Sequence, residues 1–468
     1  VASFVTDPEG DPIVFRIAST NHGTAALSGD GSHVLFSPEA GFAGDASFVV
    51  IADDGYSQSV AGTVNVHVSD APLLHLDFAD RNPKIALGAQ TRPVVIGDFA
   101  DQSGVELPFN YVSLVSTDPL VASASASGSV AGRSEGFSAL VATHGTVQAA
   151  TAMVVGNPNP FEYTQLFSGL DVYPQALTLV PQTGAKQLQV GINDENVVLA
   201  DAGSGVRYFA GNSEVLSVGA SGYLQARSEG SSEVTIIYKG AEFVVPVRVV
   251  QPVAGSALIG AEGGALSAAN GAVLQVPPDS VAGPQQISIV ATTEAQPPRA
   301  VPEDWRYVAS FTLDVGADSL ANPAQLAIPV TGYNAGDLMW LYRAGEIPDG
   351  EGGLRQVWFQ QEALVVGADG IARTSSPPYP GVTPGGVYML AAPTAPVAIA
   401  DGRLTVNMPL GIVPIMATPS GIASALVPYI AVTININRLD IIGVPAKGLP
   451  FKTSADVQLN AEIGRAHV

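Results

Sequence analysis

Cysteine is absent from all 468 residues. Without thiols the chain forms neither disulfides nor the thiolate clusters that hold structural zinc. Basic residues are scarce as well, since 20 Lys and Arg stand against 42 Asp and Glu, for a net charge of −22. Because phosphate binding needs a basic surface, this balance argues against nucleic acid as a partner. The lack of cysteine also agrees with an exported bacterial protein.

Signals for common catalytic and metal sites are sparse. The chain has no Gly-Lys-Ser/Thr phosphate loop, and its six His never occur at the spacings of a zinc site. Segment Ala202–Gly205 lacks the spacing of a nucleophile elbow and reads as a loop. Segment Gly260–Gly264 lacks the helix pattern that a dinucleotide-binding fold needs. We therefore expect no nucleophile elbow, no zinc and no enzyme activity in this chain.

Short apolar segments between turn residues are abundant. Hydrophobic residues make up 47% of the chain, while 50 Gly and 35 Pro are scattered without a period. Runs of Val, Thr and Ala that are broken by Gly and Pro are typical of short strands joined by turns. A chain of 468 residues also exceeds what a single core supports. The sequence therefore predicts an all-β protein, made of tandem immunoglobulin-like β-sandwich domains in an extended array.

Residues 1–69 alternate apolar segments with turn clusters. The apolar segments are Ile13–Ile17, His33–Phe36, Ala46–Ile51 and Thr63–Val68. The turn clusters are Asp7–Pro12, His22–Thr24, Gly29–Ser32, Phe36–Pro38, Ala40–Asp45 and Ala52–Gly55. In this order and spacing the turn clusters resemble the bacterial cadherin-like repeat of large surface adhesins. The resemblance implies a sandwich domain whose first strand would precede residue 1, so we expect this copy to be incomplete at its N-terminus.

The first turn cluster offers a candidate calcium site. Asp7, Glu9 and Asp11 place oxygen donors at alternate positions, and such donors can converge on one Ca²⁺ ion. Asp53 and Asp54 lie toward the opposite end of the predicted sandwich and would add ligands only to a neighbouring repeat. Asp-Pro and Asp-Gly also form ordinary turns, because aspartate accepts hydrogen bonds from its own backbone. The sequence leaves both interpretations open, with calcium as the only cofactor it suggests.

Residues 70–157 and 158–251 form an internal repeat. The tetrapeptide Arg-Ser-Glu-Gly starts at Arg133 and again at Arg227, which gives an offset of 94 (227 − 133). A period of this length fits whole sandwich domains better than solenoid repeats. Each tetrapeptide follows a Ser-Gly pair, and the combined pattern resembles group 2 bacterial immunoglobulin-like domains. The resemblance implies two further sandwich domains, and the second copy matches the pattern better.

Two turns are expected in each copy of the repeat. The recurrence of Arg-Ser-Glu-Gly at one position indicates a strand-to-strand turn, in which Gly136 and Gly230 supply a backbone shape that a Cβ atom disfavours. A second turn is expected at Gly145 in the first copy and at Gly240 in the second. Repetition of these residues favours a structural role over a binding site.

Residues 252–393 differ from this repeat. Glu262-Gly263-Gly264, followed by Gly271–Pro278, resembles the ZU-type domain of ankyrins and netrin receptors, which also occurs in bacterial surface and Rhs-like proteins. The resemblance implies a β-rich domain that later strands close. All three Trp lie here, at positions 305, 340 and 358. Aromatic platforms bind sugars, but three Trp in such a domain more often fill a core, so we expect them to be buried.

The segment 394–461 is long and mostly apolar. No charged residue occurs between Arg403 and Arg438, so its length would permit a membrane span. Four Pro in this stretch would break a helix, however, and we expect a strand pair of a truncated β domain instead. Residues 462–468 resemble a translated sequencing adapter and are expected to be an artefact.

Together these features predict a fragment of a large secreted or cell-surface bacterial protein that acts as a spacer and adhesion array. Short linkers limit hinge motion between its domains. They are Ser69–Pro72, Gly156–Phe161, Gln251–Ser256 and Pro393–Ala400. The expected partners are other domains of the same chain and a surface protein or carbohydrate. Two alternatives stay open: accessory β domains of an extracellular enzyme, or the N-terminal region of an Rhs-like or toxin-delivery protein.

Overall fold

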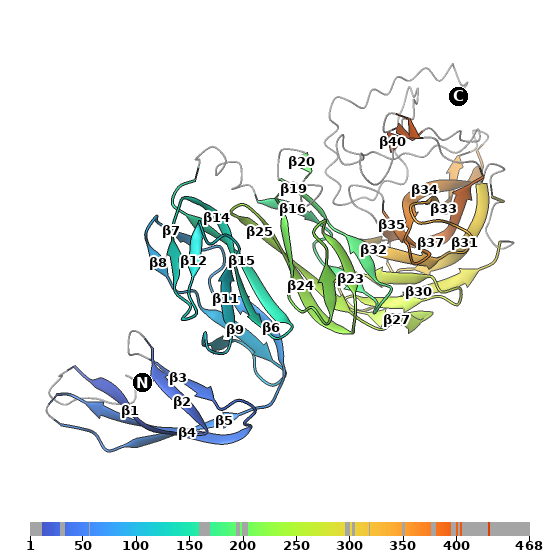
Figure 1. Ribbon diagram of the computed structural model, residues 1–468. Helices are drawn as coiled ribbons and strands as arrows, with labels where there is room; N and C mark the ends of the chain where they lie inside the picture. Colours follow the sequence, from blue (N-terminus) through green and yellow to red (C-terminus); the bar gives the residue numbers. More distant parts are fainter. Residues whose placement is uncertain are drawn as a thin grey trace. The chain divides into compact units, whose positions relative to one another are not determined.

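The computed structural model describes most of the chain up to residue 394 (Figure 1). The described residues are 12–28, 33–55, 57–158, 169–192, 197–198, 205–294, 300–301, 305–317, 319–348, 352–375 and 381–394, with short strand pieces at 399–400, 403–404 and 429–430. All regular elements in these ranges are β-strands, which confirms the predicted all-β class. Within the described ranges, no helix is long and apolar enough to cross a membrane. The chain forms two compact units, Val1–Pro158 and Asn159–Val468.

The first unit begins with two small antiparallel sheets. Their strands are β1 (Val14–Asn21), β2 (Gly23–Leu27), β3 (Val34–Pro38), β4 (Gly44–Asp53) and β5 (Gly62–Val68). One sheet has the order β1-β4-β5, and β2 pairs with β3 in the other. Inward positions at alternate residues bury Phe15, Ala46 and Phe48. The four predicted apolar segments all coincide with strands. The turn expected at His22–Thr24 is shorter than predicted, because β2 already starts at Gly23.

The rest of the first unit contains three sheets around one core. The strands are β6 (Leu73–Phe78), β7 (Lys84–Ile85), β8 (Gln90–Thr91), β9 (Val95–Phe99), β10 (Val105–Leu107), β11 (Ser113–Ser116), β12 (Ala122–Ala124), β13 (Val130–Gly132), β14 (Gly136–His144) and β15 (Val147–Val155). They form the sheets β10-β9-β6, β11-β14-β15-β7 and β12-β13-β8. Leu76, Val95, Leu140 and Met153 meet in the core between them and are fully buried.

The second unit starts with the same arrangement. Its strands are β16 (Leu170–Tyr173), β17 (Leu177–Leu179), β18 (Ala185–Gln187), β19 (Gln189–Ile192), β20 (Val197–Val198), β21 (Arg207–Ala210), β22 (Leu216–Val218), β23 (Tyr223–Ala226), β24 (Gly230–Tyr238) and β25 (Ala241–Val249). The sheets β16-β19-β20, β17-β25-β24-β21 and β18-β23-β22 repeat the pairing of β6–β15, strand for strand. The parallel pair is kept as well, since Val155↔Ile85 corresponds to Val249↔Leu179.

The predicted repeat is therefore present in the structure, and its hydrogen bonds repeat with it. Arg133 N donates to Val121 O at 2.8 Å, and Arg227 N donates to Val215 O at 2.8 Å. The glycine that ends each Arg-Ser-Glu-Gly turn has a positive φ, 154° at position 136 and 148° at position 230. This agrees with the expected strand-to-strand turn.

The second turn of the repeat differs from the expectation. In the first copy Gly145 has φ 59°, as the sequence predicts. In the second copy the residue with positive φ is Lys239 (φ 52°), one position before the expected Gly240. The hairpins β14–β15 and β24–β25 share one register, because His144 pairs with Val147 and Tyr238 with Ala241. Hairpin register thus places Lys239, and not Gly240, at the turn position of Gly145.

The next part of the second unit is one large sheet of 12 strands. Its strands are β26 (Val253–Ala254), β27 (Ser256–Ile259), β28 (Gly264–Ser267), β29 (Val273–Val276), β30 (Gln285–Thr292), β31 (Trp305–Asp314), β32 (Ser319–Pro329), β33 (Leu338–Pro348), β34 (Leu354–Val366), β35 (Ile371–Thr374), β36 (Val382–Pro384) and β37 (Gly386–Pro393). Part of the linker expected at Gln251–Ser256 is therefore strand. The isolated pieces β38 (Ile399–Ala400), β39 (Arg403–Leu404) and β40 (Tyr429–Ile430) form a further small sheet.

Gly255 joins the two ends of the large sheet. The strand order runs from β26 at one end to β27 at the other, and Gly255 alone separates these strands in the chain. Its N–H donates to Ser267 O at 2.8 Å on one side, and its O accepts from Ile289 N at 2.8 Å on the other. With φ 70° it takes a conformation that favours glycine. The sheet therefore curls until its edges meet at this residue.

Curling encloses a large apolar core. Leu274, Phe311, Leu341 and Leu390 are among its fully buried members. A second cluster contains all three tryptophans. Trp305, Trp340 and Trp358 are 5%, 1% and 2% exposed, which confirms that they fill a core.

Candidate functional site

The predicted calcium ligands Asp7, Glu9 and Asp11 lie outside the described residues. Asp53 and Asp54, at the end of β4, are described, and both carboxylates bind groups of their own turn. Asp53 Oδ1 accepts from Gly55 N at 2.9 Å, and Asp54 Oδ1 accepts from Ser57 N at 2.6 Å. Within the described part of the chain, no group of three His, Asp or Glu side chains is placed to hold a metal ion. Asp53 and Asp54 thus act as turn formers in this structure.

Four histidines each contact a local partner. His67 Nδ1 lies 2.9 Å from Asp45 Oδ1, and His75 Nδ1 lies 3.2 Å from Asp98 Oδ2. The remaining two stack on aromatic rings: His22 on Phe42 at a centroid distance of 4.1 Å, and His144 on Tyr111 at 4.0 Å. These contacts fix sheet edges and loops, and they come from different parts of the first unit.

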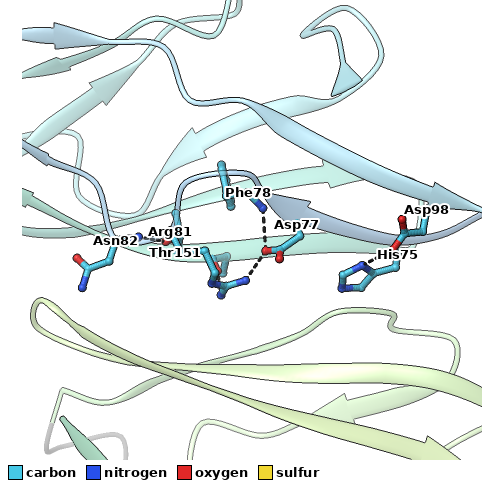
Figure 2. A network of polar contacts seen from close by, with 8 residues as sticks. His75, Asp77, Phe78, Arg81, Asn82, Asp98 and Thr151 are labelled. Carbon is cyan, nitrogen blue, oxygen red and sulfur yellow. Dashed lines mark hydrogen bonds and ion pairs between the residues drawn. The ribbon is translucent and has the colours of Figure 1, made fainter. Parts of the chain in front are cut away.

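Figure 2 shows a polar network around the loop after β6. Arg81 binds Asp77 Oδ1, and its Nη2 donates to Ala150 O at 2.9 Å. Beside it, Asn82 N donates to Thr151 Oγ1 at 2.7 Å. Because Ala150 and Thr151 belong to β15, these bonds tie the loop to a strand far along the chain. The network stabilises the position of a loop and brings no reactive groups together.

One sequence signal was missed in the first copy. Residues 132–136 read Gly-Arg-Ser-Glu-Gly, which has the spacing of a nucleophile elbow. An elbow needs a turn from a strand into a helix with the serine hydroxyl aimed at a base, whereas Gly132 ends β13 and Gly136 starts β14. Ser134 Oγ donates to Leu120 O at 2.8 Å, as Ser228 Oγ does to Glu214 O at 2.7 Å in the second copy. The serine is therefore part of a turn.

The most unusual group of side chains is a polar cluster inside the second unit. Lys186 of β18 meets Gln325 of β32: Lys186 Nζ donates to Gln325 Oε1 and, at 3.2 Å, to the backbone O of Thr374. Thr374 Oγ1 donates to the same Gln325 Oε1 at 2.8 Å. The three residues are 6%, 3% and 4% exposed. One carbonyl oxygen thus accepts from two donors in a site closed to water.

Glu362 of β34 provides a negative charge in this cluster. The residue is 2% exposed. Its Oε1 accepts from Ala363 N at 3.1 Å and Ser375 N at 3.2 Å, and its Oε2 accepts from Gly381 N at 2.7 Å. Backbone N–H groups stabilise a buried carboxylate charge. We call Lys186, Gln325, Glu362 and Thr374 the Lys186 cluster.

Burial changes the acid–base behaviour of the lysine. The loss of hydration lowers the pKa of the Lys186 amine to about 7, and the charge of Glu362 opposes this shift. A lysine with such a pKa has a large neutral fraction near neutral pH, and the neutral amine is a nucleophile. The fold therefore changes the chemistry of Lys186 strongly.

A second contact joins the same two parts of the unit. Arg373 Nη2 donates to Thr183 O at 2.5 Å, and Asp369 holds the guanidinium through Oδ1 at 2.9 Å. The hydrogen bond from Arg373 lowers the pKa of the Asp369 carboxyl. Further along, Arg248 Nη1 lies 3.3 Å from Glu262 Oε2. The strands β16–β25 and the large sheet are thus joined by charged and hydrogen-bonded groups, with the Lys186 cluster buried among them.

Sequence reasoning did not find the Lys186 cluster. The only local signal is that Lys186 lies two residues before Leu188 and four before Val190, in an alternating segment whose apolar members are buried. Its partners are 139 or more positions away in the chain, so no motif joins them. The structure alone brings them together.

The first 67 residues match a family model described as a bacterial Ig domain. No curated protein matches the chain. Among solved structures, domains 4 and 5 of the S-layer protein SbsC match with 20% identity over 26% of this chain and 69% of that one, at a TM-score of 0.17. SbsC domains 1–6 match with 17% identity, over 74% and 47%, at a TM-score of 0.18. Human protocadherin-24 EC1-2 matches with 14% identity, over 32% and 84%, at a TM-score of 0.14.

The chain spans less than half of the SbsC structure of domains 1–6. The match to a bacterial Ig domain covers residues 1–67.

Proposed function

We propose that this chain is a stretch of a bacterial protein that works outside the cell or on its surface, as a non-catalytic spacer and adhesion array. The observation that carries the proposal is the repeated domain. What the two copies share is scaffold: strand pairing, turn glycines and the bonds of Arg133 and Arg227. Among their described residues, the two copies share no cluster of reactive side chains. Duplication of a domain that carries only structural features adds length to the protein, and added length is the property that a spacer requires.

The finer family assignments support the same proposal. The turn clusters of residues 1–69 resemble a cadherin-like repeat, and the match to a bacterial Ig domain covers almost the same stretch. We propose group 2 immunoglobulin-like domains for 70–157 and 158–251, and a ZU-type domain for 252–393. The absence of cysteine and the net charge of −22 suit an exported protein. Its partners are proposed to be neighbouring domains of the same chain and a surface protein or carbohydrate.

A spacer is expected to unfold one domain at a time under force. We would stretch the full chain in an atomic force microscope and record the length released in each event. Extension of a domain the size of Leu73–Val155 releases roughly 30 nm of chain. Separate events of about this size would support the proposal. Gradual extension at low force would contradict it.

The two alternative functions make different predictions about sequence beyond residue 461. YD-type repeats there would indicate an Rhs-like protein, and a compact domain with catalytic motifs would indicate an extracellular enzyme. Further sandwich repeats would support the adhesion array. The full reading frame decides between them.

A further inference from the structure

The Lys186 cluster places an amine against a carboxamide. Lys186 Nζ donates to Gln325 Oε1, which is covalently bound to the amide carbon Cδ, so the nitrogen lies beside the carbon that an amine attacks. Both side chains are almost completely buried. We propose that Lys186 and Gln325 join covalently through an isopeptide bond that links β18 to the large sheet.

The reaction balances without any other reagent. The lone pair of the neutral Lys186 amine attacks Gln325 Cδ and forms a carbon–nitrogen bond. A proton moves from Nζ to the departing Nε2, the bond between Cδ and Nε2 breaks, and ammonia leaves. The product is an amide between the two side chains, with no change in oxidation state. Hydrolysis would cleave the new amide and leave a lysine and a glutamate, and burial keeps water away from the bond.

Thr374 and burial favour the attack. As Nζ approaches Cδ, negative charge develops on Gln325 Oε1, and Thr374 Oγ1 already donates to this oxygen at 2.8 Å. Thr374 therefore contacts a reacting atom and acts as an oxyanion donor. Lowering of the Lys186 pKa by burial increases the fraction of neutral amine at neutral pH. The amine and the amide are also held by the fold, which makes the step intramolecular.

Glu362 lies on the side of the leaving group. Its Oε2 accepts from Gly381 N at 2.7 Å. A Cβ atom at Gly381 would come within 2.8 Å of Gln325 Nε2, so both the carboxylate and the departing nitrogen lie against this glycine.

The first copy of the repeat lacks these groups. Val130 pairs with Thr91 in β8, and its counterpart Leu224 pairs with Lys186 in β18, so Thr91 occupies the position of the lysine. Threonine has no amine to form the bond. A cross-link at this position is therefore specific to the second copy, and the first copy is an internal comparison.

Intact-mass spectrometry of the full purified chain tests the proposal. We expect a mass lower than the sequence mass by one ammonia molecule. After trypsin digestion we expect one peptide containing Lys186 joined to one containing Gln325. A wild-type chain with its full sequence mass would overturn the proposal and leave the cluster as a set of hydrogen bonds.

Variants show whether any mass deficit comes from this pair. Lys186→Met and Gln325→Met each remove one reacting group, and both should restore the full mass. Lys239→Met is the matched control, because it removes another lysine of the second copy and should keep the deficit. A deficit that persists in Lys186→Met would contradict the bond, since an Asn-Gly succinimide also loses ammonia.

Force measurements give a second readout that does not need the variants to be equally stable. A bond between Lys186 and Gln325 keeps the roughly 140 residues between them from extending, which withholds roughly 50 nm of chain. The wild-type chain should therefore be shorter at full extension than Lys186→Met by about this length. Equal lengths would overturn the proposal, while loss of separate unfolding events would contradict the spacer function instead.

Discussion

Gly145 and Lys239 occupy the same left-handed turn position in the two copies of the repeat, with φ 59° and 52°. Glycine adopts this conformation readily, whereas an L-residue with a Cβ atom does so at a cost. The second copy thus carries a local strain that the first copy avoids.

Replacement of Lys239 by glycine should relieve this strain. We expect Lys239→Gly to raise the free energy of unfolding of the second copy by about 1 kcal/mol. Lys239→Ala is the control, because it keeps the strained φ and removes the side-chain contacts of the lysine, among them that of Nζ with the Tyr238 ring, 5.4 Å from its centroid. Urea denaturation would measure both. If the glycine variant were no more stable than the alanine variant, strain at this turn would be refuted.

Gly128 should tolerate a side chain less well than Gly145. Both have positive φ, but a Cβ at Gly128 would lie 2.0 Å from the Phe109 ring, whereas a Cβ at Gly145 has no atom within 4 Å. Gly145→Ala is expected to cost about 1 kcal/mol of stability. Gly128→Ala is expected to cost about 1–3 kcal/mol more, because the ring must move. Thermal unfolding of the two variants would show the difference, and equal costs would contradict the close approach.

Loss of the Lys186 amine should weaken the large sheet that it contacts. Lys186→Met removes the proposed cross-link to Gln325, and by analogy with disulfides such a cross-link contributes about 2–4 kcal/mol. All three Trp lie in the large sheet and are buried. Their fluorescence therefore reports the unfolding of that sheet, although the substitution is in β18. Lys239→Met is the matched control, and an unchanged fluorescence midpoint in Lys186→Met would show that the cluster does not couple the two parts.

A lysine that keeps its amine should make stability depend on pH. In Gln325→Met the proposed bond cannot form, and burial still lowers the pKa of the amine below its ordinary value of about 10.4. In the unfolded chain the pKa returns to that value, so the unfolded state binds more protons between the two pKa values. The free energy of unfolding is therefore expected to rise with pH across this window.

In the wild-type surroundings the lowered pKa is about 7. Urea titrations of Gln325→Met between pH 6 and 10 should show an increase on the order of a few kcal/mol. Below the folded pKa both states are protonated, and the dependence should vanish. The double variant with Lys186→Met should lack the increase. A rise that survives in the double variant would come from another group.

Calcium remains a prediction for Asp7, Glu9 and Asp11. If these residues bind the ion, millimolar calcium should raise the melting temperature of the full chain and a chelator should lower it. The triple variant Asp7→Asn, Glu9→Gln, Asp11→Asn should abolish the response. A melting temperature that neither calcium nor chelator changes would favour plain turns.

Local patterns predicted much of this fold. The alternation of residues 13–68 marked four strands, and Arg-Ser-Glu-Gly marked a turn that the structure shows twice. The aromatic content of 252–393 predicted buried Trp. These features can be predicted because strand alternation, turn chemistry and core composition each depend on residues that are close together in the sequence.

Non-local features escaped the sequence. The residue that corresponds to Gly145 in the second copy is Gly240 or Lys239, depending on the register of the β24–β25 hairpin. A slip of one residue changes that register. The role of Gly255 depends on two strand partners that are distant from each other in the chain. Alternation with Leu188 and Val190 puts Lys186 on a buried face, but its partners Gln325 and Glu362 are distant in the chain. The burial of a charged residue depends on its partners, and the partners of Lys186 lie too far along the chain to form a short motif with it.

The position of Lys186 also limits how this protein can evolve by rearrangement. A copy with Thr91 at the equivalent position can pack beside many kinds of domain, because threonine carries no charge that a neighbouring domain must compensate. A copy with Lys186 tolerates only a neighbouring domain that supplies the amide and carboxylate or that leaves the lysine in water, since an uncompensated buried charge is costly. The two copies are therefore not exchangeable modules. Recombination that packed another domain over Lys186 would bury its charge without these partners and destabilise the chain, so the second copy and the large sheet should be inherited together.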